Sequence, residues 1–287
     1  MFSIVGTVPD NNFPLISGLG SMENDHVVIE NERVAVNRGT PALIAAACET
    51  LKYLHKPNPH CYLVGDTGDG EGSKRLYKYL AENITDFPLK TITFHYYQPD
   101  VIWFKKVAAA IEKMPVRPIL IADAGFMYVA KMSGKASFFD LFTPDAGELA
   151  YLADEKAPHP FYTRGFILHE GNKVPDLIKR AYDHNNAANY LLVKGVKDYV
   201  ADKNGVIAVV DRPLEKVLEA IGGTGDTLTG IVSALISTGM AIDKSAVYAA
   251  RVNRFAGSFA KPNPATQIYE IIKQIPRALK EVLENDQ

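Results

Sequence analysis

The sequence predicts an α/β protein whose mainly parallel central sheet is covered by helices on both sides. Short runs of β-branched and other apolar residues alternate with longer segments of helical periodicity along most of the chain. Uninterrupted apolar strands are buried on both faces, which requires a layer of helices on each side of the sheet. No internal repeat, low-complexity tract or linker interrupts this pattern. We therefore expect residues 1–287 to form a single domain.

Ten short segments have the composition of strands. Several are uninterrupted apolar runs, such as the Ile-Leu-Ile-Ala segment after Pro118. Two pairs of segments are predicted to form hairpins, one around Asn31 and one across residues 203–205. The predicted strands are 3–8, 26–30, 33–36, 61–65, 91–95, 118–122, 138–142, 190–193, 199–202 and 206–210.

Six segments have the periodicity and end signals of longer helices. Thr40 is predicted to cap the first one, with Pro41 at the first helical position, where its missing N–H costs nothing. Gly239 and Pro262 end two later helices, and an amphipathic helix begins at Gln267. The predicted helices are 40–54, 73–83, 101–113, 227–238, 244–260 and 267 onward.

Composition and charge exclude several classes of protein. Hydrophobic residues make up 47% and charged residues 22%, as in ordinary globular proteins. A formal net charge of -2 does not favour nucleic-acid binding. No window resembles the roughly 18 uncharged apolar residues of a membrane span, and the N-terminus lacks the basic start of a signal peptide. We therefore expect a cytoplasmic protein with no membrane partner.

Cysteine and histidine give no sign of a structural metal site or a disulfide framework. Cys48 and Cys61 both lie in apolar surroundings and are expected to be buried thiols. The seven histidines are scattered without the i, i+4 pairing of a zinc-binding helix. We expect no metal ion bound directly by side chains of this kind.

Polar residues follow several of the predicted strands directly. Asp66, Asp123, Thr143 and Lys194 each come after an apolar run. In open α/β sheets, ligands bind outside the carboxyl ends of the strands. These four positions therefore predict a ligand site at that edge of the sheet. The glycine-rich segment 64–75 is expected either to border this site or to form a plain exposed turn.

The most informative segment reads IGGTGDTLTGIVSALISTG. Gly222, Gly223 and Gly225, with Thr224 between them, let the backbone approach a ligand closely. The following helix presents free N–H groups and a positive dipole end, which suit an anion. Asp226 there can accept a proton from a substrate hydroxyl while the amides hold a phosphoryl group. The alternative is that this aspartate only caps the helix.

This segment resembles the signature of the ribokinase-like superfamily. It is most similar to the branch of ADP- or ATP-dependent NAD(P)H-hydrate dehydratases, whose members are often labelled carbohydrate kinases. Upstream, ILIADAGFMYVA resembles the branch's strand that ends in aspartates, TPDAGELAYL its Thr-Pro and Gly-Glu segment, and LLVKGVKDYVADKNG its Lys-Gly hairpin along the nucleotide. The four segments occur in the family's order over about residues 118–257. The resemblance implies a three-layer α/β/α ribokinase-like fold, with ATP or ADP and Mg2+ as cofactors.

The resemblance also assigns roles to matching positions. Asp226 matches the catalytic aspartate, and Gly222–Gly225 match the anion hole. Glu148 matches an acidic position that acts through water on magnesium and phosphate, and Asp123 matches an aspartate near the substrate. The implied nucleotide contacts are Lys194, Gly195, Val196, Lys197, Asp198 and Gly225. Simpler roles remain open, because the glutamate can complement a helix dipole, the lysine can be a solvated surface residue, and Asp123 can cap a turn.

The substrate side departs from the family pattern. The dehydratases have a Gly-Pro-Gly-Leu-Gly loop where this chain has FHYYQPD at 94–100, and a histidine where it has Asp145. Their Gly-Ala-Ala helix start is replaced by residues 39–41, which begin with Gly39. We therefore expect a rebuilt acceptor pocket, unless the aromatic residues of this region only pack in the core. The candidate wall residues are His95, Tyr96, Tyr97 and Trp103.

Three functions remain in competition. The first is a kinase that transfers phosphoryl from ATP to a hydroxyl of a small metabolite, such as a sugar. The second is the ADP- or ATP-dependent NAD(P)H-hydrate dehydratase, in which phosphorylation of a hydroxyl primes its elimination. The third is a nucleotide-binding regulator without catalysis, which the presence of Asp226 disfavours. Ribokinase-like relatives often form homo-oligomers.

Overall fold

Eleven strands form one sheet in the part of the chain that the computed structural model describes, residues 1–154 and 173–284. Their order is β11-β10-β9-β8-β7-β6-β1-β5-β2-β3-β4. The strands from β9 to β5 in this order are parallel, and the two edges are antiparallel. Their bounds are β1 Phe2–Val8, β2 Ile16–Glu23, β3 His26–Ile29, β4 Glu32–Ala35, β5 His60–Gly65, β6 Thr91–His95, β7 Ile119–Ala122, β8 Leu141–Phe142, β9 Tyr190–Val193, β10 Asp198–Asp202 and β11 Gly205–Val210.

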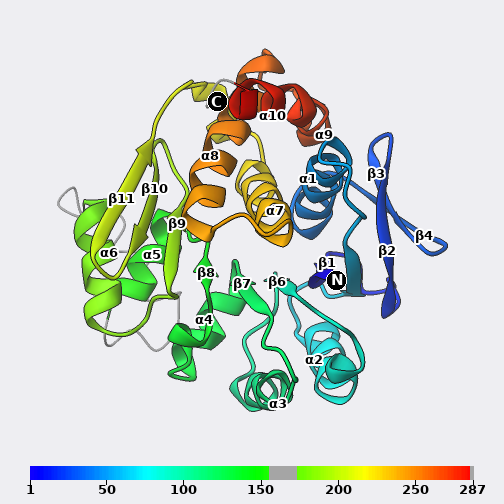
Figure 1. Ribbon diagram of the computed structural model, residues 1–287. Coiled ribbons are helices and arrows are strands. Elements are labelled where there is room, and N and C mark those ends of the chain that lie inside the picture. The colour runs from blue at the N-terminus through cyan, green and yellow to red at the C-terminus, as the bar shows by residue number, and fades with distance from the viewer. Residues whose placement is uncertain (155–172, 285–287) are drawn as a thin grey trace.

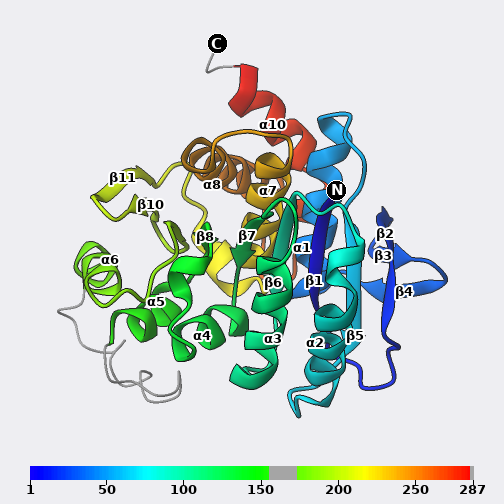
Figure 2. The same cartoon turned by 60° about the horizontal axis from the view of Figure 1, so that its bottom comes forward.

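Helices cover both faces of this sheet, as Figures 1 and 2 show. Each layer shares an apolar core with the sheet, because the parallel strands are buried on both sides. One layer contains α1 (Thr40–Tyr53), α7 (Thr224–Ser237), α8 (Ile242–Phe259), α9 (Ile268–Ile272) and α10 (Ile275–Glu284). The other contains α2 (Glu71–Asn83), α3 (Val101–Glu112), α4 (Gly125–Met132), α5 (Ala146–Ala153) and α6 (Val174–Asp183). The predicted three-layer α/β/α fold is confirmed.

The structure corrects the sequence prediction at several elements. The predicted strand 138–142 is shortened to β8, because residues 136–138 form a 3-10 helix, and helix α6 was not predicted. Strand β2, which lies between β5 and β3, was not predicted, because its two glycines leave no continuous apolar run. The final helix is divided into α9 and α10, which are separated by a turn at residues 273–274. Thr40 is the first residue of α1 and not its cap, which is Gly39. The two cysteines are buried free thiols, as predicted.

Close packing of α1 against α7 places the first turns of both helices side by side. A Cβ atom at Gly230 of α7 would lie 2.2 Å from the backbone oxygen of Leu43 in α1, so only glycine permits this approach. The first residues of α1 consequently meet those of α7, although the helices are far apart in sequence. This contact determines where the predicted glycine–aspartate segment lies relative to the sheet.

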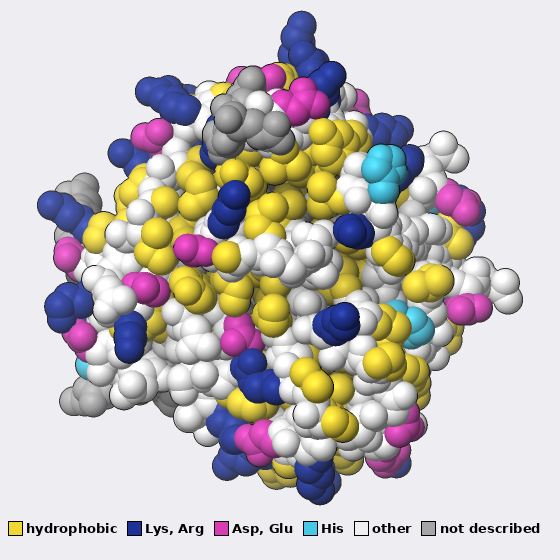
Figure 3. Space-filling view, viewed as in Figure 1, with side chains coloured by type: hydrophobic (Ala, Val, Ile, Leu, Met, Phe, Trp, Pro, Cys, Tyr) yellow, Lys and Arg dark blue, Asp and Glu magenta, His cyan; other side chains and the backbone are white. Residues whose placement is uncertain are grey.

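The described helices and one face of the molecule bear on membrane and nucleic-acid binding. None of the helices within residues 1–154 and 173–284 is long and apolar enough to cross a bilayer. On the face drawn in Figure 3, basic and acidic side chains are interspersed among the described residues, while hydrophobic ones gather over the middle and upper part. This face therefore lacks the concentration of positive charge that nucleic-acid binding uses.

Candidate active site

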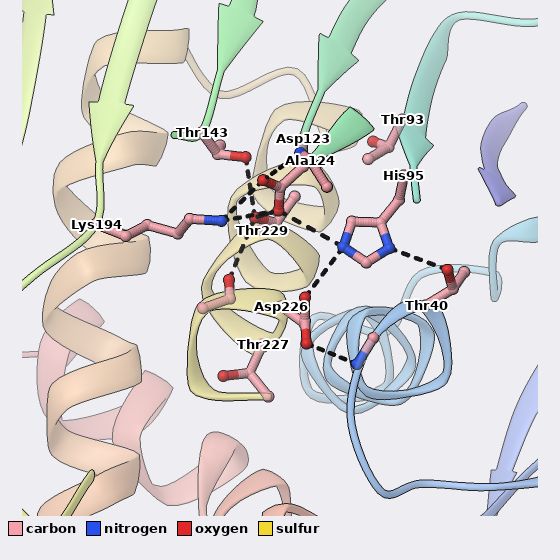
Figure 4. A network of polar contacts seen from close by, with 12 residues as sticks. Thr40, Thr93, His95, Asp123, Ala124, Thr143, Lys194, Asp226, Thr227 and Thr229 are labelled. Atoms are coloured by element: carbon pink, nitrogen blue, oxygen red, sulfur yellow. Dashed lines mark hydrogen bonds and ion pairs between the residues drawn. The ribbon is translucent and has the colours of Figure 1, made fainter. Parts of the chain in front are cut away.

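Four parallel strands bring polar side chains to one point at their carboxyl ends (Figure 4). His95 is the last residue of β6, and Asp123, Thr143 and Lys194 directly follow β7, β8 and β9. Helix α7 passes close to these ends and adds Asp226. The convergence that the sequence predicted from its apolar runs is therefore present for three of the four expected positions. The sequence predicted His95 only as a residue of the acceptor pocket's wall.

A buried ion pair occupies the middle of this cluster. The Lys194 ammonium lies 2.8 and 2.9 Å from the two carboxylate oxygens of Asp123, whose side chain is 1% exposed. The same carboxylate accepts hydrogen bonds from the Thr229 hydroxyl, at 2.6 Å, and from the backbone N–H of Ala124, at 2.8 Å. Burial works against the charged lysine, but the charges of Asp123 and Glu148 outweigh it and raise the pKa of Lys194. The solvated-lysine interpretation is therefore wrong.

The Asp226 carboxylate is held from two sides. One oxygen accepts the backbone N–H of Gly39 at 2.6 Å, and the other lies 3.1 Å from Nε2 of His95. Burial tends to raise the pKa of Asp226, but the hydrogen bond and charge of His95 lower it below its ordinary value. The Lys194 charge and the Gly39 N–H act in the same direction. This carboxylate is therefore poised to stay ionised.

The glycine–aspartate segment forms the N-terminus of α7 as predicted, with one correction to its start. Helix α7 begins at Thr224, and Gly223 caps it with φ 98°, a value that favours glycine. The first intrahelical bond runs from the N–H of Thr227 to the Gly223 oxygen at 2.9 Å, so the amides of 224–226 precede the helical ladder. No side chain caps the helix, so Asp226 does not act as the cap that the simpler interpretation required.

The first of two neighbouring cavities, of about 630 Å3, extends from this helix start along the loop after β9. Gly223–Asp226 and most of the predicted nucleotide contacts line it, whereas Lys197 does not and lies 3.8 Å from Asp211. The lining nucleotide contacts are Lys194, Gly195, Val196, Asp198 and Gly225. The cavity is therefore lined both by the first residues of α7, where the sequence predicted an anion hole, and by the predicted nucleotide loop.

Two acidic residues border this cavity as a capping box. The Asp145 side chain accepts the N–H of Glu148 at 2.8 Å, and the Glu148 side chain accepts the N–H of Asp145 at 2.8 Å. Burial, followed by the carboxylates of Asp123 and Asp145, raises the pKa of Glu148 despite the opposing charge of Lys194. The glutamate thus does stabilise its helix, while also facing the cavity. Asp145 lies at the first cavity, although the sequence placed it on the substrate side.

Arg254 of α8 holds the predicted nucleotide loop through hydrogen bonds and was not identified from the sequence. Its Nε lies 2.7 Å from Asp198, and its Nη2 donates to the backbone oxygens of Gly195 and Val196 at 3.0 and 2.9 Å. Burial raises the pKa of Asp198, and the charge and hydrogen bond of Arg254 oppose that effect. Its position in the sequence could have indicated this role, because Arg254 lies four residues after Ala250 and therefore on the same inward face of the helix.

The second cavity, of about 650 Å3, adjoins the first, and Asp226 lines only the first of the two. Gly39, Tyr96 and Tyr97 line it as the sequence predicted. His95 lies behind its wall and is fully buried, and Trp103 lines neither cavity. Tyr97 also belongs to the core, so both interpretations of the aromatic residues apply to it. The residues common to both cavities are Arg38, Tyr96, Ala124 and Glu148.

The glycine-rich segment 64–75 borders this second cavity, which excludes the plain-turn interpretation. Asp66, Thr67 and Gly68 are among its lining residues. The Asp66 carboxylate is occupied with its own loop and accepts the N–H groups of Gly68, Gly70 and Ser73. It therefore shapes the cavity wall, and it lies apart from the ion pair at the other strand ends.

Comparisons with known proteins decide the family. A family model described as NAD(P)H-hydrate dehydratase matches residues 103–277, more than half of the chain. The chain belongs to the NAD(P)H-hydrate dehydratase family. An uncharacterized protein of Methanocaldococcus jannaschii is 41% identical over 242 residues, which are 84% of this chain and all of that protein. An ADP-dependent (S)-NAD(P)H-hydrate dehydratase of Cenarchaeum symbiosum is 28% identical over 181 residues, 61% of this chain and 56% of the relative.

Solved structures confirm the ribokinase-like fold of this dehydratase family member. An ADP/ATP-dependent NAD(P)H-hydrate dehydratase from Bacillus subtilis, co-crystallized with ATP and Mg2+, superposes with a TM-score of 0.57 at 13% identity, over 98% of this chain and 89% of the other. Phosphofructokinase-2 from Escherichia coli gives a TM-score of 0.52 at 12% identity, over 98% and 100%. The resemblance stated from four short segments is confirmed, and the family supports the dehydratase prediction better than the sugar-kinase prediction.

Proposed function

We propose that this protein is an adenine-nucleotide-dependent NAD(P)H-hydrate dehydratase. ATP or ADP occupies the first cavity, with its terminal phosphoryl group at the amides of Gly223–Gly225, and the hydrate enters the second. The observation that carries the proposal is the position of Asp226, a buried carboxylate in the first turn of α7 that lines the first cavity and accepts the N–H of Gly39, a residue of the second cavity's wall. Family membership supports this substrate class. We also propose that both cavities belong to one domain, residues 1–287.

The chemistry follows from this position. Asp226 accepts the proton of the hydrate hydroxyl as its oxygen attacks the terminal phosphorus, and the bond to the nucleotide's bridging oxygen breaks. The phosphorylated oxygen then leaves its carbon as phosphate and the neighbouring ring carbon loses a proton to water, so that the double bond of the nicotinamide ring is restored. The α7 amides stabilise the negative charge of the phosphoryl group during transfer.

Three carboxylates make the neighbourhood suitable for Mg2+. Glu148 faces Asp123 and Asp145, and these neighbours contribute to the increase in its pKa, so a divalent cation would relieve their repulsion. We propose that Glu148 and Asp145 hold Mg2+ through water. The ion would neutralise charge on the nucleotide phosphates when bound.

Recovery of NADH tests the proposal. Hydrated NADH is incubated with the protein, Mg2+ and either ATP or ADP, and the return of NADH absorbance is followed. We expect nucleotide-dependent recovery that is absent without protein and lost in Asp226→Asn. No recovery with either nucleotide would contradict the assignment.

A kinase acting on another metabolite is the second candidate. The observation that favours it is that most of the second cavity's lining lies outside the matched region 103–277, including Gly39, Tyr96 and Tyr97. ADP release that depends on one alcohol, from a panel of sugars and vitamin precursors, would support this candidate. Tight nucleotide binding by calorimetry without either reaction would favour a regulator.

A further inference from the structure

A buried histidine contacts the carboxylate to which the proposed function assigns proton abstraction. His95 is fully buried, and its Nε2 lies 3.1 Å from Asp226 and 3.7 Å from Asp123 (Figure 4). Its Nδ1 lies 3.0 Å from the Thr40 hydroxyl at the start of α1. The imidazole therefore joins β6, α1 and α7 through one ring.

The surroundings determine which nitrogen carries hydrogen. Nε2 faces oxygens of two carboxylates, and ionised carboxylates only accept hydrogen bonds. An unprotonated Nε2 would direct its lone pair at two negative groups in a buried site, so Nε2 carries a proton. The hydroxyl of Thr40 then donates to Nδ1, or accepts from it when the ring is charged.

The position of Asp226 in its helix explains why such a contact matters. Asp226 is the third residue of α7, and an acidic side chain at that position can reach back to the free N–H of the cap residue. A carboxylate turned that way would occupy the N–H of Gly223, one of the amides that the phosphoryl group needs. Instead, the Gly39 N–H and His95 Nε2 draw its two oxygens toward β6 and α1.

We propose that Thr40, His95 and Asp226 form a buried hydrogen-bonded chain in which His95 is a positioning residue. It holds the carboxylate away from the α7 amides, so that the amides stay free for the phosphoryl group and the carboxylate faces the acceptor hydroxyl. The role in proton abstraction rests on the proposed function. The hydrogen-bonded chain itself does not.

The charged and titratable groups that face Asp226 set the expected pH dependence. They are His95 from β6, Asp123 after β7, Lys194 after β9, and Tyr96, whose own pKa is raised by burial and then by the charge of Asp226. Removing His95 leaves burial, which raises the pKa of Asp226, opposed mainly by Lys194. The ionised fraction at a given acidic pH therefore falls, and the acid limb of kcat/KM moves to higher pH.

The first test needs no turnover. Long-range 1H–15N correlation spectra of the protein labelled in histidine, assigned with His95→Gln, report the protonation of each ring nitrogen. We expect Nε2 of His95 to be protonated across the pH range of stability. A neutral ring protonated on Nδ1 alone would overturn the proposal. The metal content of the same sample is measured as well, because His95, Asp123 and Asp226 also have the spacing of a metal site. A bound metal at one equivalent that is lost in His95→Gln would also overturn it.

The second test separates positioning from packing. His95→Leu should lower kcat about 100-fold, the scale of a misplaced reacting group, and raise the acid limb of kcat/KM. Affinity for AMP, which lacks the terminal phosphoryl group, should stay within about threefold, since only the amides proposed to hold that group are affected. His95→Gln, which can still donate a hydrogen bond to Asp226, should recover most of the turnover. The matched control is His60→Leu, because His60 is bonded to Ser17 at 2.8 Å outside the site.

The outcomes distinguish the two proposals. Wild-type turnover in folded His95→Leu, or an equal loss in His60→Leu, would contradict the positioning role. Wild-type protein without nucleotide-dependent turnover would contradict the proposed function, while the ring-nitrogen measurement would still decide the hydrogen-bonded chain.

Discussion

Replacing Lys194 by methionine should destabilise the protein strongly, although the substitution keeps an unbranched side chain of similar length. The ammonium lies 2.8 and 2.9 Å from the oxygens of Asp123, and only 12% of the lysine side chain and 1% of the aspartate side chain are exposed. Without the lysine, a buried carboxylate loses its counter-charge. Breaking a buried pair in this way costs about 3–5 kcal/mol.

Two hydrogen bonds moderate this effect. Asp123 keeps the Thr229 hydroxyl and the Ala124 N–H as donors, so we expect a loss near the lower limit, about 3 kcal/mol in the free energy of unfolding. This is a large share of the 5–15 kcal/mol by which native proteins are usually stable. The double variant with Asp123→Asn removes both charges and should recover at least about 1 kcal/mol.

Urea denaturation without nucleotide measures the effect. The matched control is Lys197→Met, because Lys197 makes an exposed pair at 3.8 Å with Asp211, and such pairs contribute at most about 1 kcal/mol. Equal denaturation slopes show that the surface exposed on unfolding is unchanged. Equal losses in the two variants would refute the argument that a buried charge at Asp123 depends on Lys194.

Two further predictions concern the nucleotide cavity. Arg254→Lys should weaken ADP binding by at least about tenfold, because an ammonium cannot reproduce the guanidinium fork that joins Asp198 to two loop carbonyls. Calorimetry measures this affinity, and an affinity equal to that of the control Arg277→Lys would contradict the prediction. Because the pKa of Glu148 is raised, its charged fraction increases as pH rises, so Mg2+-dependent ADP affinity should increase from mildly acidic to mildly alkaline pH. A similar increase in Glu148→Gln would contradict the role of this side chain.

Local patterns in the sequence were enough to predict the strand ends and the helix start. An apolar run followed by a polar residue marks the edge of a buried strand wherever it occurs, so Asp123, Thr143 and Lys194 could be assigned to one edge. The glycines before Asp226 indicate an anion site through their backbone freedom alone. Neither inference needs knowledge of which segments meet in space.

Partners of these residues could not be predicted, because they depend on packing between distant segments. Asp226 bonds to Gly39 and His95, which lie 187 and 131 positions away, and the contact depends on the close approach of α1 to α7 at Gly230. The position of Asp145 at the first cavity likewise depends on packing between distant segments, so the sequence did not predict it. His159 and His169, included in the expectation of no zinc site, lie outside the described residues.

The substitution Asp226→Asn tests the central claim most directly. Asparagine keeps the size of the side chain and an oxygen that can accept the Gly39 N–H, but it cannot take a proton from the substrate hydroxyl. We predict nucleotide affinity within several-fold of wild type and nucleotide-dependent turnover reduced by at least about 100-fold. Wild-type turnover in a folded Asp226→Asn protein would show that this carboxylate is not the base.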